Sequence, residues 1–125
     1  MKTVKEIFKQ LQWGFEVECY LLDQEKKEQF NKSLKTLCQG IIITNDSSLD
    51  SSFSITNEET GDIKTWSEGI EIITPPLPSD KAFVLLDKIF KKMNGLCKTD
   101  ETCGLHVNVS FKDIEMKDFP VFNFD

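Results

Sequence analysis

The chain has 125 residues, a formal net charge of −6 and a pI near 4.8, which fits one small acidic domain. All 15 basic residues are lysines, so the arginine forks typical of nucleic-acid recognition are missing and we expect no nucleic-acid partner. Hydrophobic residues make up 39% of the chain, which is enough for a modest core and argues against global disorder. No apolar run reaches the roughly 18 residues of a membrane span and no secretion signal is recognisable, so we expect a cytoplasmic protein with no membrane partner.

The first third of the chain predicts a strand and a helix followed by a second strand. Phe15, Val17 and Cys19 alternate with polar residues, which is the pattern of a half-buried strand. Asp23 is expected to cap the helix that follows it. The predicted elements are a short helix or extended lead-in at 4–10, a strand at 12–22, a helix at 24–37, a strand at 41–44 and a turn at 45–48.

The rest of the chain predicts a hairpin, two strands and a second helix. Leu105, Val107, Val109 and Phe111 alternate with polar residues in the last strand. The predicted elements are a hairpin with arms at 52–56 and 62–66, a strand at 69–74, a helix at 81–94 capped by Ser79 or Asp80, and a strand at 104–111; the helix has an apolar stripe of Phe83, Leu86, Ile89, Phe90 and Met93. This order predicts an α+β fold in a single domain, 1–125, with an antiparallel sheet and helices packed on one of its faces.

Three of the predicted strands place acidic or imidazole side chains opposite their apolar faces. These residues are Glu16 and Glu18, Glu71, and His106 with Asn108. Residues two apart in a strand lie on one side, roughly 6.5–7 Å apart, so two carboxylates could flank a cation. Carboxylate oxygens suit Mg²⁺ or Mn²⁺. The alternative interpretation is a solvated sheet face, which antiparallel sheets often have.

The four cysteines show no C-x-x-C spacing, so the sequence predicts reduced thiols. Cys19 and Cys38 lie in apolar patterns and are expected to be buried as small hydrophobic residues. Cys97, Cys103 and His106 are an alternative zinc ligand set, but a fourth ligand is not evident.

Three motifs resemble the amidoligase family of the glutamine synthetase and glutamate–cysteine ligase superfamily. The first is Gly14-Phe15-Glu16-Val17-Glu18, which is similar to a G-x-E-x-E strand. The second runs from Gly69 through Glu71 to Pro75-Pro76-Leu77 and is similar to the G-x-E-[ILV]-x-[ST]-P-P-L pattern with which a strand of the family ends. The third is Cys103-Gly104-Leu105-His106-Val107-Asn108, which resembles C-G-x-H-V-H. An Asp46-Ser47-Ser48 turn stands where the family has Asp-Gly-Ser.

The resemblance implies a partial glutamine synthetase-like catalytic domain that uses ATP and Mg²⁺ to join a carboxylate to an amine through an acyl phosphate. It implies small-molecule or peptide substrates that carry these two groups. It implies that Glu16, Glu18 and Glu71 bind the metal ion and that His106 and Asn108 are catalytic. It implies that Asp46, Ser48 and Ser110 border the substrate or nucleotide.

Departures from the family pattern keep a second hypothesis open. Asn108 replaces the second histidine, and the chain lacks both the arginine and the later acidic ligand that the family pattern calls for. The sequence therefore predicts the N-terminal portion of a longer ligase domain, completed by a missing C-terminal half or by a homo-oligomer partner. The alternative is a non-catalytic remnant or an assembly and binding module with a similar fold. The apolar tail with Phe119, Val121, Phe122 and Phe124 fits either a truncated domain or an added edge strand.

Overall fold

The computed structural model describes residues 3–45, 53–56, 59–61, 63–66 and 69–112. In this part of the chain, none of the helices has the length and apolar character needed to cross a membrane. The helical elements are α1 (Val4–Lys9), the 3₁₀ turn η1 (Gln24–Lys26), α2 (Lys27–Lys35) and α3 (Ser79–Met93). The strands are β1 (Leu11–Leu21), β2 (Ile42–Asn45), β3 (Phe53–Thr56), β4 (Ile63–Trp66), β5 (Gly69–Ile73), β6 (Leu77–Pro78), β7 (Cys97–Lys98) and β8 (Leu105–Phe111).

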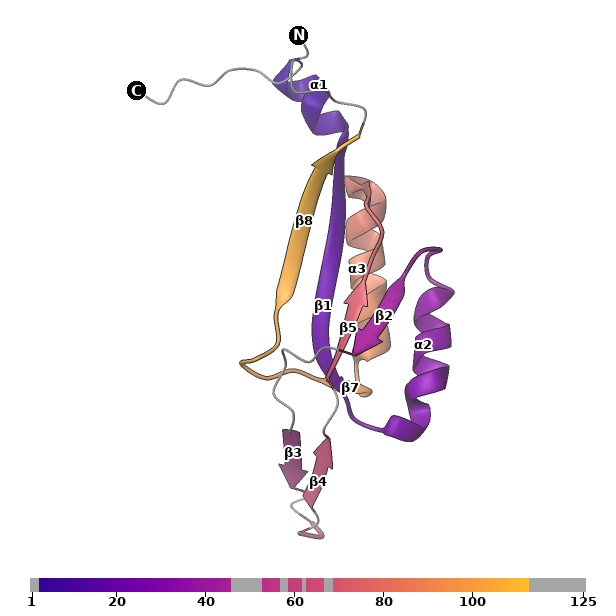
Figure 1. The fold of residues 1–125 in the computed structure, drawn as a ribbon, viewed down its shortest axis with the longest axis vertical. Helices are drawn as coiled ribbons and strands as arrows, with labels where there is room; N and C mark the ends of the chain where they lie inside the picture. The colour runs from indigo at the N-terminus through magenta and orange to yellow at the C-terminus, as the bar shows by residue number, and fades with distance from the viewer. Residues whose placement is uncertain (1–2, 46–52, 57–58, 62, 67–68, 113–125) are drawn as a thin grey trace, which may run out of the picture.

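The main sheet is antiparallel and is organised around the long strand β1. On one side β1 pairs with β5 and then with the short β6, and β2 adds to the far edge of β5. On its other side β1 pairs with β7 and with β8, which runs along most of its length (Figure 1). Among the described strands, β8 therefore forms one edge of the sheet and β2 the other.

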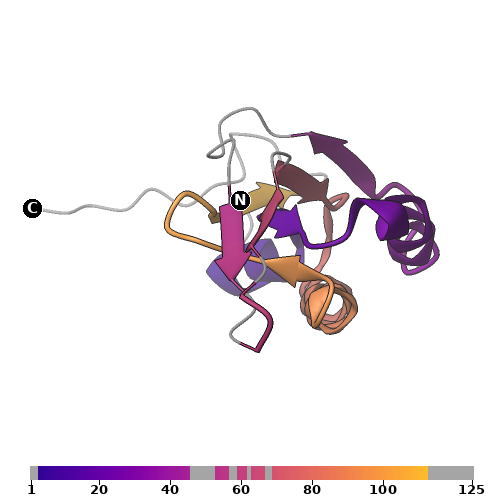
Figure 2. The same ribbon diagram turned by 90° about the horizontal axis from the view of Figure 1, so that it is seen from below.

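The helices α2 and α3 cover one face of this sheet. Phe15 and Val17 of β1 and Ile72 of β5 point into a core that also contains Phe30 of α2 and Ile89 of α3. Seen from below, both helices lie to the same side of the strands (Figure 2). The expected α+β class, with an antiparallel sheet and helices packed on one face, is confirmed.

The helix predicted at 24–37 is present but is shorter and begins with a tighter turn. The Asp23 carboxylate accepts the backbone N–H of Glu25 at 3.0 Å, which is the expected capping contact. The helix ends at Lys35, and the Thr36 hydroxyl donates to the carbonyl of Ser33 at 2.7 Å. Hydroxyls that bind carbonyls of the preceding turn commonly mark such ends.

The second long helix differs from the prediction in its start and in its buried face. It begins at Ser79, so its N-cap is Pro78, whose side chain has no hydrogen-bond acceptor, and the predicted cap by Ser79 or Asp80 is absent. The Ser79 hydroxyl accepts the indole N–H of Trp13 at 2.7 Å. Its buried residues are Ala82, Leu85, Ile89 and Met93. Phe83 and Phe90, which were predicted in the core, are 48% and 43% exposed. The helix is therefore turned so that two phenylalanines point past the sheet contact.

The polar segment between β2 and β5 forms the predicted hairpin as a separate unit. Strands β3 and β4 pair in antiparallel register as a two-stranded sheet apart from the main one (Figure 1). The predicted turn at 45–48 lies outside the described residues except for Asn45, and so does the apolar tail from residue 113 onward.

Candidate functional site

The strand register brings most of the predicted polar site residues onto one face of the sheet. Glu16 lies directly opposite His106, and Glu18 lies opposite Glu71 on the other neighbouring strand. Asn108 lies opposite Gly14 and Ser110 opposite Gln12, which extends the same face along β8. Side chains directly opposite one another in an antiparallel pair share a face. The prediction that separate strands present these residues to one side is confirmed.

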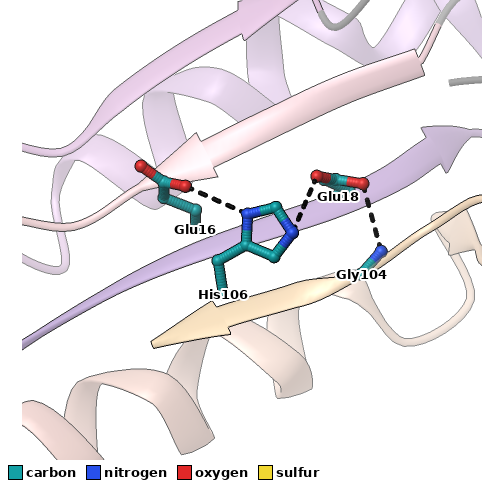
Figure 3. Close-up of polar contacts among 4 residues, drawn as sticks. All are labelled: Glu16, Glu18, Gly104 and His106. Carbon is teal, nitrogen blue, oxygen red and sulfur yellow. Dashed lines mark hydrogen bonds and ion pairs between the residues drawn. The ribbon is translucent and has the colours of Figure 1, made fainter. Parts of the chain in front are cut away.

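Three of these side chains form a contact cluster, which we call the Glu16–Glu18–His106 trio. His106 Nδ1 lies 3.3 Å from Glu16 Oε2, and His106 Nε2 lies 3.6 Å from Glu18 Oε1. The second oxygen of Glu18 accepts the backbone N–H of Gly104 at 3.1 Å (Figure 3). The imidazole therefore sits between two carboxylates, and one of these is also held by the main chain.

Burial differs sharply across the trio and decides which contact matters for stability. The Glu18 side chain is only 8% exposed, whereas Glu16 is 32% and His106 59% exposed. A buried carboxylate needs hydrogen-bond donors, and Gly104 supplies one from the backbone. Gly104 also leaves room for the ring, because a Cβ there would lie 3.3 Å from His106 Nε2. The close approach of Gly104 to this cluster explains the Cys-Gly-x-His spacing without reference to a ligand.

The described residues show no metal centre of the kind predicted at Glu16, Glu18 and Glu71. Residues 3–45, 53–56, 59–61, 63–66 and 69–112 contain no group of three or more His, Cys, Asp and Glu side chains arranged to hold a metal ion. From the sequence, a cation from outside the chain is expected to balance these adjacent acids. The His106 imidazole lies between the two carboxylates and the backbone N–H of Gly104 binds Glu18, so groups of the chain itself occupy the space beside these acids.

The other predicted site residues are placed but their roles stay predictions. Glu71, Asn108 and Ser110 lie on the polar face, and no described contact assigns them a catalytic or binding task. Asp46 and Ser48, predicted beside the substrate or nucleotide, lie outside the described residues.

The cysteines are all unpaired thiols, as predicted, and three of them lie near one another where β1, β7 and the following loop meet. Cys19 is fully buried, and its hydrogen bond with Cys97, together with burial, raises the pKa of the Cys19 thiol far above its ordinary value. Burial also raises the pKa of Cys103. The alternative zinc site with Cys97, Cys103 and His106 is not seen among the described residues, where His106 contacts Glu16 and Glu18 instead.

The opposite face of β8 carries a feature that the sequence did not predict. Leu105, Val107, Val109 and Phe111 lie opposite core residues of β1 in the register, yet they are 46%, 47%, 46% and 38% exposed. By the register they lie on the same face of the sheet as the core residues Phe15 and Val17 of β1. Such a face of an edge strand is normally covered or broken up by charges.

The two exposed phenylalanines of α3 border this uncovered strand. The ring of Phe83 lies 5.5 Å from that of Phe15, which is the register partner of Val107. Phe90 and Leu105 line one groove of about 230 Å³. We call the combined area the β8–α3 surface, which consists of Leu105, Val107, Val109 and Phe111 with Phe83 and Phe90. Exposed apolar side chains gathered in one region are a common feature of interaction surfaces.

Comparison with known proteins gives no family for the chain. No family model matches the sequence, and no curated protein matches it. Among the solved structures that match are the B. subtilis GlnK–ATP complex, at 11% identity, and the periplasmic divalent cation tolerance protein CutA from Archaeoglobus fulgidus, at 14% identity. The first match covers 82% of this chain and 84% of that chain, the second 86% and 89%, and both have a TM-score of 0.35. Likeness at this level gives no information about ligand or activity.

The predicted membership of the amidoligase family was wrong. No family model supports it, and the matched structures above are GlnK and CutA rather than glutamine synthetase-like ligases. The motifs have a simpler physical origin, because alternation on a strand with one polar face places acids two residues apart. Glu16 and Glu18 meet the G-x-E-x-E pattern for this reason, and Gly104 meets its motif because of the close approach to His106.

Proposed function

We propose that this domain is a binding and assembly module that recognises a partner protein through β8 and catalyses no reaction by itself. The observation that carries the proposal is the β8–α3 surface, an uncovered apolar area bordered by an edge strand. Residues 105–111 contain no Lys, Asp, Glu or Pro in a chain that is 29% charged. Edge strands that must avoid pairing usually carry such residues, so this edge is suited to receive another strand.

The polar face supports the same proposal. The carboxylates that a catalytic acid pair would need already have partners within the chain. Glu16 contacts His106, and Glu18 contacts both His106 and the backbone N–H of Gly104. Its contacts join β1 to β8 and to the turn before β8. The trio thereby holds β8 in place, which keeps the opposite, apolar face of that strand presented.

Photo-cross-linking in the cells that make this protein tests the proposal. A photoreactive amino acid replaces Val109 on β8, and in a matched control it replaces Val84, which is 53% exposed on α3 and lines a different groove with Leu37 and Leu77. We expect a protein adduct at position 109, identified by mass spectrometry, and little adduct at position 84. Absence of adducts at position 109, or equal adducts at both, would contradict a binding role for β8.

The cofactors expected from the sequence are measured separately. Binding of ATP stays a prediction, and calorimetric titration of the full chain with ATP, with and without Mg²⁺, tests it directly. A module of the proposed kind shows no ATP hydrolysis in either titration. Hydrolysis by the purified chain that exceeds the buffer blank would contradict the non-catalytic part of the proposal.

A further inference from the structure

We propose that the partner of β8 is the β8 strand of a second copy of this chain, paired antiparallel about a twofold axis at Asn108. This inference rests on the proposed function, because it names the partner of the same surface. The two copies would form one continuous sheet through their edges, a common way in which sheets recognise extended strands.

The hydrogen bonds between β1 and β8 determine which groups of β8 face outward. The backbone N–H of Lys112 donates to the carbonyl of Gln10 at 3.0 Å, and the backbone N–H of Glu18 donates to the carbonyl of Gly104 at 3.1 Å. Both pairs follow the β1–β8 register, in which hydrogen-bonded and non-hydrogen-bonded pairs alternate. The even-numbered residues of β8 therefore bond to β1, and Val107 and Val109 present their N–H and C=O groups at the open edge.

A twofold axis at Asn108 matches the outward groups of Val107 and Val109. Val107 then lies opposite Val109 of the partner subunit, and both residues have outward-facing backbone groups, as a hydrogen-bonded antiparallel pair requires. Residue Asn108 lies opposite its own copy as a non-hydrogen-bonded pair. An axis shifted by one residue, between 108 and 109, would set outward groups against inward ones.

The side chains are self-complementary in the same register. On the helix side Val107 meets valine and Leu105 meets phenylalanine; on the polar side Asn108 meets asparagine and His106 meets serine. Cross-strand pairs of matched character stabilise a sheet. Residues 105–111 contain no Lys, Asp or Glu, so two copies of an acidic chain meet there without like charges of these residues directly opposed. A different protein would be expected to recognise β8 through charged residues complementary to its own, and β8 carries no Lys, Asp or Glu.

Disulfide trapping tests the register itself in the full chain. Asn108→Cys places two thiols directly opposite each other across the proposed axis, at a non-hydrogen-bonded pair where side chains approach most closely. Ser110→Cys is the matched control, because in this register it lies opposite His106 of the partner subunit and far from its own copy. We expect mild oxidation to give a disulfide-linked dimer of Asn108→Cys and not of Ser110→Cys or the unchanged chain. Equal trapping of both variants, or of neither, would overturn the register.

Sedimentation equilibrium tests the self-association. We expect the unchanged chain and Val84→Lys to form a dimer as concentration rises, and Val107→Lys to remain a monomer, since Val84 and Val107 have similar exposure, 53% and 47%. Circular dichroism checks that Val107→Lys folds. Asn108→Lys is the second variant, because it leaves β8 in place and puts two positive charges across the axis.

The possible results separate this inference from the proposed function. A monomer at every concentration, or equal loss in Val84→Lys, overturns the second-copy assignment. If cross-linking at position 109 then captures a different protein, the binding role of β8 stands and only the identity of the partner is wrong. If cross-linking captures nothing, both fail.

Discussion

Replacing Glu18 tests whether the chain neutralises its own acidic cluster. Glu18→Ala removes the acceptor of the Gly104 N–H, and a hydrogen bond to a charged group contributes about 1.5–3 kcal/mol. The contact of Glu18 with His106 adds about 0–1 kcal/mol, because His106 is largely exposed. We therefore expect Glu18→Ala to lower the free energy of unfolding by about 1.5–4 kcal/mol.

Two further variants show which contact of Glu18 is responsible. Glu18→Gln keeps an oxygen for the Gly104 N–H and is expected to lose about 1 kcal/mol or less. Glu16→Ala removes only the exposed contact with His106 and is expected to lose less than about 1 kcal/mol. Urea unfolding in buffer with a chelator measures all three variants.

A gain in stability on replacing Glu18 would contradict this prediction. Two acids that lack a counter-charge repel each other, so Glu18→Gln would then raise stability in the absence of metal, and Mg²⁺ would stabilise the unchanged chain more than the variant. Either outcome would refute the reasoning that His106 and the Gly104 amide balance the Glu16 and Glu18 carboxylates.

Three other predictions concern the core and the thiols. Thr74→Val should cost about 1–3 kcal/mol in urea unfolding, because the buried Thr74 hydroxyl accepts the backbone N–H of Phe15 at 2.8 Å and valine cannot; a cost no larger than that of an exposed threonine would contradict this. Ile89→Ala should cost about 2–5 kcal/mol and Phe90→Ala clearly less in the same assay, since Ile89 is buried and Phe90 is 43% exposed; the reverse order would mean that the buried face of α3 is assigned wrongly. Burial raises the pKa of Cys103, so its alkylation by iodoacetamide, followed by peptide mass spectrometry, should need a higher pH in the folded chain than in urea; identical pH profiles would show that the thiol is not shielded.

The sequence predicted the strands and their faces well because period-two patterns are local. Glu16, Glu18 and His106 alternate with apolar residues, so their common face could be inferred before their contacts were known. The sequence could not show that His106 lies between the two glutamates. That placement depends on the register of β8 against β1, which strand patterns do not determine.

The errors at α3 have a different cause. An apolar stripe on a helix shows which side chains avoid water but not which neighbouring element covers them. Phe83 and Phe90 belong to the stripe, yet the sheet contact uses Ala82, Leu85 and Ile89. The small side chain of Ala82 permits close approach of the helix to the sheet, which hydrophobicity alone does not reveal. Among the residues that the structure describes, Phe83 and Phe90 stay about half exposed beside β8.

Residue-resolved hydrogen exchange of β8 tests the central claim most directly. We expect the amides of Val107 and Val109 to exchange quickly in dilute solution and to become protected as the protein concentration rises, because their N–H groups face the open edge. The Asn108 amide, which faces β1, should be protected at every concentration and serves as the internal control. Rapid exchange of Val107 and Val109 at all concentrations would contradict the assignment of β8 as the strand through which two copies of this chain assemble.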